Sequence, residues 1–131
     1  MWTHVATLGQ YDCLLLKGNR NMNDIGLTLD HVQMPARDPE GLAAWYAQTF
    51  GLRAQQNRVY GSDFLIVFLP GTPVQRSPEL HFGLNVGNMR ALAAWAEKLG
   101  SPLISGKTEY ASVYAHDPEG NGVELYCLAN A

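Results

Sequence analysis

A segment of this chain recurs at an offset of fifty residues, and this repeat limits the fold more than any other feature. The sequence reads LAAWYAQTFG over residues 42–51 and LAAWAEKLG over residues 92–100, and the same offset places His31 on His81. Four shared letters alone would be ordinary helical sequence, but a repeat that also aligns two histidines indicates a duplicated unit. We therefore expect two copies of one supersecondary motif.

Each copy predicts a strand that leads into a helix. Asp38-Pro39-Glu40 supplies an N-cap, a first-turn proline and a first-turn carboxylate, so a helix should begin there and end at Gly51. Fifty residues later, Asn88 is the matching cap and Gly100 the matching stop. Helical spacing predicts two buried stripes, formed by Leu42, Trp45, Tyr46 and Phe50 and by Leu92, Trp95, Ala96 and Leu99.

Extended runs follow each predicted helix. Each half should therefore consist of a strand, a helix and two or three further strands. We expect an α+β fold in which modules 25–75 and 76–131 form a curled mixed sheet, with a helix outside each half and an approximate two-fold between them. The extended runs cover residues 53–60 and 63–69 in the first half, and 103–104, 111–116 and 122–128 in the second.

Residues 1–24 lie outside the repeat and form an N-terminal extension to a single domain at 25–131. Their pattern fits either an extra edge hairpin or a mobile arm. The longest apolar run near the start, Cys13 to Leu16, is too short for a signal peptide or a membrane span. We therefore expect a cytoplasmic protein.

Composition points to a small-molecule partner. Only 9 of the residues are Lys or Arg and they form no basic stripe, which argues against a nucleic-acid surface. Hydrophobic residues make up 47% of the chain and charged residues 16%, as in an ordinary globular domain. Because the apolar run near the start is too short to span a bilayer, we expect no membrane partner either.

Two histidines and one carboxylate indicate a metal centre. The internal symmetry places His31 and His81 at equivalent points of equivalent strands, near the axis and on the same concave face. Glu124 is an isolated carboxylate in an otherwise apolar strand. Each residue alone has an ordinary structural interpretation, either a hydrogen-bonded core histidine or a solvent-facing acid. Together, two imidazoles and one carboxylate form a facial set that holds a divalent metal and leaves positions open for substrate.

Three segments of the chain point to a known family: LDHV at 29–32, ELHFGLNV at 79–86 and VYAHDPEGNGVELY at 113–126. They resemble the vicinal oxygen chelate superfamily, and the resemblance extends over residues 25–128. That superfamily includes glyoxalase I, extradiol dioxygenases, methylmalonyl-CoA epimerase, fosfomycin-resistance transferases and bleomycin-binding proteins. The resemblance implies a pair of βαβββ modules, metal ligation by His31, His81 and Glu124, and a homodimer in which one site often takes ligands from both chains.

Departures from the family patterns reduce the number of family reactions that this chain could catalyse. Glyoxalases and epimerases typically add a polar ligand from the last strand of the first module, where this chain has Ile66 or Val67. Neither side chain can take a proton, which argues against isomerisation by a pair of carboxylates. The basic residues that follow the carboxylate in fosfomycin transferases are also missing, because the chain ends seven residues after Glu124.

Two further residues are candidates for contact with substrate. The alternation of a strand places Tyr114 on one face with Ser112 and His116, and matching positions in extradiol enzymes and fosfomycin transferases carry a substrate-facing Tyr. A buried structural Tyr is the alternative. Lys107 stands where an extradiol enzyme has a His, although loop lysines are usually only solvated. The Asp117 to Asn121 turn is assigned a geometric role alone.

These residues predict a metal-dependent enzyme that acts on a small substrate with vicinal oxygens. Fe2+ or Mn2+ would favour dioxygen chemistry, whereas Zn2+, Ni2+ or Co2+ would favour a lyase or isomerase. We favour extradiol-dioxygenase-like chemistry, with the glyoxalase-like lyase or isomerase as the alternative. A metal-free small-molecule-binding protein of the bleomycin-resistance kind is a third interpretation, but such proteins usually lack the complete set of two His and one Glu.

Overall fold

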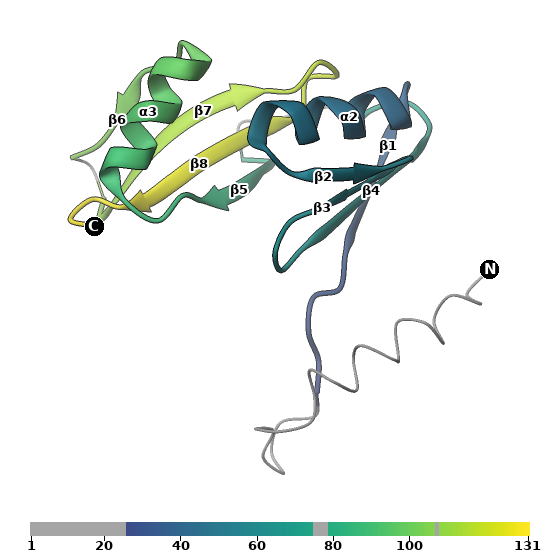
Figure 1. Ribbon diagram of the computed structural model, residues 1–131, viewed down its shortest axis with the longest axis horizontal. Coiled ribbons are helices and arrows are strands. Elements are labelled where there is room, and N and C mark those ends of the chain that lie inside the picture. The colour runs from purple at the N-terminus through teal and green to yellow at the C-terminus, as the bar shows by residue number, and fades with distance from the viewer. Residues whose placement is uncertain (1–25, 75–78, 107) are drawn as a thin grey trace. The chain divides into compact units, whose positions relative to one another are not determined.

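The computed structural model describes residues 26–74, 79–106 and 108–131 (Figure 1). Residues 26–30 form no helix or strand, and His31–Ala131 form one compact unit. The prediction of a separate extension over 1–24 falls outside the described residues. The first module contains β1 (Val32–Ala36), α2 (Pro39–Phe50), β2 (Arg53–Gln55), β3 (Arg58–Tyr60) and β4 (Leu65–Pro70). The second contains β5 (His81–Asn85), α3 (Met89–Leu99), β6 (Leu103–Ile104), β7 (Tyr110–His116) and β8 (Gly122–Leu128).

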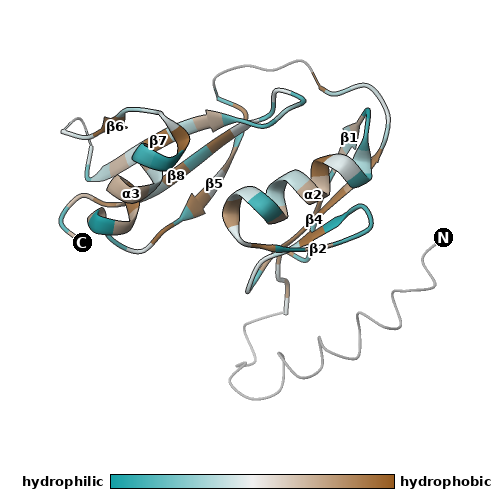
Figure 2. Ribbon diagram, turned by 45° about the horizontal axis from the view of Figure 1, so that its top comes forward, coloured by the Kyte–Doolittle hydropathy of each residue, from teal (hydrophilic) through white to brown (hydrophobic). Residues whose placement is uncertain are grey.

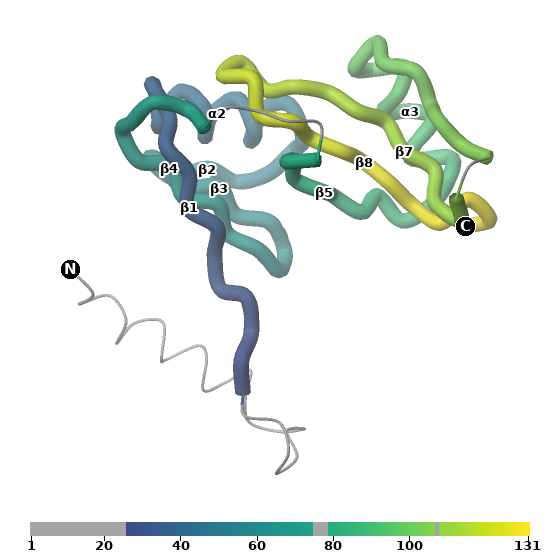
Figure 3. The backbone as a smooth tube through the Cα atoms, turned by 180° about the vertical axis from the view of Figure 1, so that it is seen from behind, coloured from purple at the N-terminus to yellow at the C-terminus, as the bar shows by residue number. Residues whose placement is uncertain are grey.

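Each module forms its own four-stranded mixed sheet. The strand orders are β1-β4-β3-β2 and β5-β8-β7-β6, so the two sheets have the same topology. β1 is parallel to β4 and β5 is parallel to β8, while the remaining neighbours are antiparallel. Figure 3 follows β5 alongside β8 and β1 alongside β4. The predicted fold of two βαβββ modules is confirmed.

The helix ends lie where their capping residues predict. The side chain of Asp38 accepts a hydrogen bond from Gly41 N at 3.1 Å, and that of Asn88 accepts one from Ala91 N at 2.8 Å. Gly51 ends α2, and Gly100 ends α3 in the same left-handed conformation, with φ of 68°. A side chain would be strained at that φ, which is why glycine stops both helices.

Each helix covers one face of its own sheet. α2 packs on β1 to β4 and α3 packs on β6, β7 and β8. Hydrophobic stretches run along β4 and β8 in the middle of the two sheets (Figure 2). We call the opposite, helix-free side of each sheet its open face. The described helices include none that is long and apolar enough to cross a membrane. The buried core residues are Ala36, Leu42, Ala43, Tyr46, Val59, Ile66, Phe68, Leu92, Ala111, Val113, Val123, Leu125 and Cys127.

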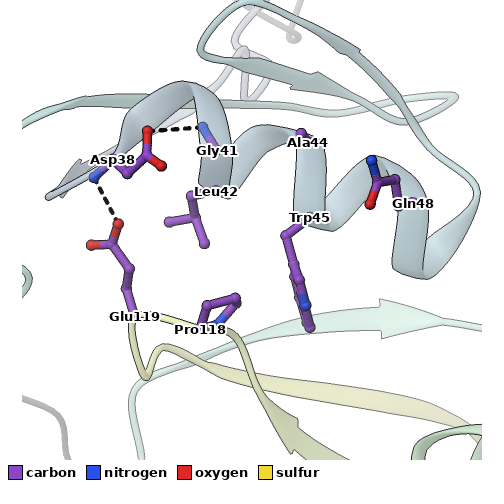
Figure 4. A pocket seen from close by; sticks show the side chains of 8 residues that line it. All are labelled: Asp38, Gly41, Leu42, Ala44, Trp45, Gln48, Pro118 and Glu119. Carbon is purple, nitrogen blue, oxygen red and sulfur yellow. Dashed lines mark hydrogen bonds between the residues drawn. The ribbon is translucent and has the colours of Figure 1, made fainter.

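The turn between β7 and β8 joins the second module to the first. Glu119 accepts two backbone hydrogen bonds at the start of α2, from Arg37 N at 2.7 Å and from Asp38 N at 2.8 Å. Figure 4 shows this carboxylate beside Asp38, with Pro118 below Leu42. The turn therefore does more than connect two strands, which was its only predicted role.

A buried carboxylate makes a further contact between this turn and α2. Asp117 is 4% exposed and accepts hydrogen bonds from the Tyr46 hydroxyl at 2.7 Å and from Asn121 Nδ2 at 2.8 Å. Its other oxygen accepts from the backbone N–H groups of Glu119 and Asn121. Burial, together with the hydrogen bond to Asp117, raises the pKa of Tyr46 far above its ordinary value. Tyr46 therefore remains a hydrogen-bond donor throughout the physiological pH range.

Candidate metal centre

Four polar side chains meet on the open face of the second sheet. Register places Gly83 of β5, Glu124 of β8 and Tyr114 of β7 side by side in one row. Because Val123 and Leu125 are buried against the helix side, Glu124 between them points to the open face. The same alternation brings Ser112 and Tyr114 to that face, as predicted, and His81 joins them from the start of β5.

The Glu124 carboxylate is the centre of this cluster. Its Oε1 lies 2.9 Å from His81 Nε2, while Oε2 accepts hydrogen bonds from Ser112 Oγ at 2.5 Å and from the Tyr114 hydroxyl at 3.2 Å. Ser112 is buried, whereas Tyr114 is 45% exposed. One carboxylate oxygen is thus held by the sheet, and the other is directed at the imidazole.

Aromatic rings border the cluster. The rings of His81 and Tyr114 meet edge to face with centroids 6.0 Å apart. Further along the open face, Tyr110 and Tyr126 meet in the same way at 5.7 Å. Aromatic side chains therefore lie beside the polar groups on this open face.

The spacing of His81 and Glu124 fits two ligands of one divalent ion. Two donor atoms each about 2.1 Å from a metal and at right angles to each other lie about 3.0 Å apart. The observed separation of Nε2 and Oε1 is 2.9 Å. The side chains of His81 and Glu124 are 28% and 18% exposed, so an ion could reach them from the open face.

His31 does not join this pair within one chain. Among the residues that the structure describes, no group of three His, Cys, Asp or Glu side chains is close enough to hold a metal ion. His31 directly precedes β1, and the alternation of that strand places it with Gln33 on the open face of the first sheet. The structure therefore brings together two of the three predicted ligands. Lys107, the second predicted catalytic residue, lies outside the described residues.

The first sheet has no counterpart of the Glu124 carboxylate. Its equivalent row is Gln33, Val67 and Arg58, so Val67 stands where the second sheet has Glu124 and Arg58 stands where it has Tyr114. Of the two positions that the sequence left open, Ile66 is buried on the helix side and Val67 lies on the open face. Val67 is therefore the residue at the position where the sequence predicted no proton acceptor.

Sequence reasoning did not identify every contact of the cluster. The hydrogen bond from Ser112 to Glu124 was not predicted, although the alternation of β7 had placed Ser112 on the correct face. Residues twelve apart become neighbours only through the hairpin register of β7 and β8. The alignment of that hairpin was the signal that could have revealed the pair.

The comparison with protein families gives a match over residues 27–126, to the glyoxalase-like domain. This chain belongs to that family. The match begins before β1, ends within β8 and includes the whole cluster around Glu124. A comparison with curated proteins gives no match.

Solved structures with the same fold include several members of the superfamily. Lactoylglutathione lyase from Agrobacterium tumefaciens is 20% identical with a TM-score of 0.55, over 76% of this chain and 92% of that one. The fosfomycin resistance protein FosX from Listeria monocytogenes is 17% identical with a TM-score of 0.65, over 77% and 93%. FosX from Mesorhizobium loti is 18% identical with a TM-score of 0.60, over 76% and 91%. At these identities the likeness concerns the fold alone.

Proposed function

We propose that this glyoxalase-like chain is a metal-dependent enzyme that acts on a small substrate with two neighbouring oxygens. The observation that carries the proposal is the Glu124 carboxylate, which has one oxygen held by Ser112 and the other beside His81 on an accessible face. A carboxylate so oriented, next to an imidazole at the spacing of two metal ligands, is suited to hold a divalent ion.

The third ligand in this proposal is His31 of a second copy of the chain. His31 belongs to the open face of the first sheet, while His81 and Glu124 belong to the open face of the second. A homodimer that faces the first sheet of one copy toward the second sheet of the other would complete two equivalent sites. When bound, the metal would act as a Lewis acid on the vicinal oxygens of the substrate.

Exposed apolar surface supports a dimer of this kind. Tyr110, Tyr114 and Leu128 are 43%, 45% and 47% exposed, and all three lie on the open face of the second sheet. β1 and β5 are also edge strands of their sheets. Unpaired edges beside apolar faces are commonly covered by another chain.

The protein's own residues favour dioxygenase-like chemistry over isomerisation. Ser112 holds the carboxylate in place. The half-exposed Tyr114 hydroxyl donates its only proton to Glu124 over 3.2 Å, and it would exchange this long hydrogen bond for one to a substrate oxygen. Val67 offers no second carboxylate to move a proton between neighbouring carbons. Lys107 would add positive charge near the substrate. Under this proposal Fe2+ or Mn2+ is the working metal, and a lyase using Zn2+, Ni2+ or Co2+ is the alternative.

A complementation experiment tests the shared site. His31→Ala and Glu124→Ala homodimers should each retain little metal, because every site lacks one ligand. After subunit exchange at equal amounts, half of the dimers combine both variants and carry one intact site, so the mixture should recover about a quarter of the wild-type metal. The metal content is measured by mass spectrometry after removal of weakly bound ions.

The control for this mixture uses His81→Ala with Glu124→Ala. Both residues lie on the second sheet, so no arrangement of these chains restores an intact site. Recovery in the control, or no recovery in the test mixture, would exclude the shared site. A wild-type monomer carrying a full complement of metal, as judged by light scattering, would exclude it as well.

Tyr114→Phe separates the chemistry from metal binding. The variant should turn over a catechol-like or 2-oxo substrate roughly ten to a thousand times more slowly, which is the loss expected for one transition-state donor. The metal content should be unchanged, because the shorter hydrogen bond from Ser112 still holds Glu124 Oε2 when the longer one from Tyr114 is lost. Steady-state kinetics with the iron-loaded protein and metal analysis of the same samples give the two readouts. Loss of metal would show that Tyr114 is structural.

A metal-free binding protein is the second candidate. His81 and Glu124 already form an ion pair or hydrogen bond with each other at 2.9 Å, an arrangement that satisfies both groups without an ion. Under this interpretation, wild-type protein purified without an affinity tag would contain no stoichiometric metal, and Glu124→Ala would leave the affinity for small planar ligands unchanged.

A further inference from the structure

The open face of the first sheet is positively charged. Arg53 and Arg58 lie on it, because their strand neighbours Ala54 and Val59 face the core. Strands β1 to β4 contain no Asp or Glu on either face. This sheet therefore carries two positive charges without a compensating acid, although the chain as a whole has a net charge of -3.

Arg58 lies in the same row as Gln33, which is two residues after the proposed metal ligand His31. Arg53, in contrast, lies on β2 at the opposite edge of the sheet. β4 separates β3 from β1, so Arg58 stands two strands from Gln33, on the order of 10 Å between backbones. Arg53 lies opposite Tyr60, and its guanidinium carbon is 4.1 Å from the centre of the Tyr60 ring. That cation–π contact holds Arg53 toward the middle of the sheet.

Arg58 occupies a specific position in the internal symmetry. It is the counterpart of Tyr114, the residue beside Glu124, and its own neighbour is Val67 in place of a carboxylate. The two modules thus present different chemistry at equivalent points. The second offers a carboxylate, an imidazole and a phenol, and the first offers an apolar strand with guanidinium groups on one side of it. No ion pair to Arg58 is formed by the residues that the structure describes.

We propose that Arg58, with Arg53 beside it, binds an anionic group of the substrate, either a carboxylate or a phosphonate, remote from the vicinal oxygens. The inference rests on the proposed function, since only the shared site brings this face to the metal ligands of the other copy. Guanidinium groups bind such anions through two parallel hydrogen bonds, and a face without acids does not compete for them. The substrate is then an acid whose neutral analogue binds poorly.

Calorimetry with a matched ligand pair tests the specificity. Catechol and 3,4-dihydroxybenzoate share the vicinal oxygens and differ in one carboxylate. The Ni2+-loaded wild type should bind 3,4-dihydroxybenzoate about ten times more tightly than catechol, and Arg58→Gln should lose this preference while binding catechol normally. Arg58→Lys should keep part of the preference, because it keeps the charge and loses the bidentate geometry.

Arg90→Gln is the matched control. Arg90 is exposed on α3, so its removal changes the net charge by the same amount without altering the open face of the first sheet. It should leave the preference unchanged. Equal preferences in wild type and Arg58→Gln would overturn the inference even if metal binding by His81 and Glu124 were established.

A second measurement does not depend on the metal. In NMR spectra of the chelator-treated protein, the side-chain N–H signal of Arg58, identified by its loss in Arg58→Gln, should shift on addition of benzoate or phenylphosphonate. The anion giving the larger shift at equal concentration identifies the preferred acid. Shifts without metal binding would support the anion site and count against the metal centre. No shift with either anion would refute the anion site.

Discussion

Glu124→Gln is expected to weaken metal binding by at least about a hundred-fold, since the loss of an outer partner of a ligand alone costs ten- to a hundred-fold. The amide keeps the size of the side chain and can still accept a hydrogen bond from Ser112, which lies 2.5 Å from Oε2 in the wild type. It loses the negative charge that would hold a divalent ion beside His81. Competition against a metal-sensing dye measures the dissociation constant.

Glu97→Gln is the control for this variant. Glu97 is an exposed carboxylate on α3, on the helix side of the second sheet, and its replacement removes one negative charge away from the cluster. Its metal affinity should equal that of the wild type. If Glu124→Gln binds metal as tightly as Glu97→Gln, then Glu124 is not a ligand and the proposed centre is wrong.

Asp117→Ala is expected to lower the free energy of unfolding by roughly 3 to 5 kcal/mol, which is among the larger effects of single substitutions. Asp117 is buried and accepts hydrogen bonds from the Tyr46 hydroxyl, the Asn121 side chain and two backbone N–H groups. Removing the carboxylate leaves these donors without an acceptor, and several of them remain buried. Urea denaturation followed by far-UV circular dichroism measures the change.

Tyr46→Phe provides the graded comparison. It removes one of the donors to Asp117 and leaves the aromatic packing of α2 against Phe68 in place. The expected loss is about 1 to 2 kcal/mol, that of one hydrogen bond to a charged group. A loss in Asp117→Ala no greater than in Tyr46→Phe would mean that the turn contributes little beyond the Tyr46 contact.

The local features of this protein follow from its sequence alone. Asp38 and Asn88 begin the two helices, and Gly51 and Gly100 end them in the left-handed conformation, as predicted. Caps and stops depend on residues within four positions of one another, so their physics is complete in a short segment. The fifty-residue repeat gave the two-module fold for the same reason, since each copy carries the same local signals.

The alternation of side chains along each strand predicted which residues share a face of the sheet. Ser112 and Tyr114 were predicted to share one face, because side chains alternate with a period of two and that period is visible in the sequence. That Glu124 lies on the same face was shown by the register of β7 and β8. His81 was identified by its symmetry with His31. The prediction that Ile66 or Val67 replaces a carboxylate was resolved to Val67 only by the strand register.

Contacts between distant segments were decided by the tertiary structure. Asp117 meets Tyr46 across 71 positions, and Glu119 meets the start of α2 across more than 80. Nothing in a turn-forming stretch indicates which helix it will contact, because that depends on how the two modules pack against each other. The pairing of β5 with β8 brought His81 beside Glu124, while His31 stayed on the other sheet of the chain. Each module closes its own hydrogen-bonded sheet, and no strand pairing links the two sheets among the described residues.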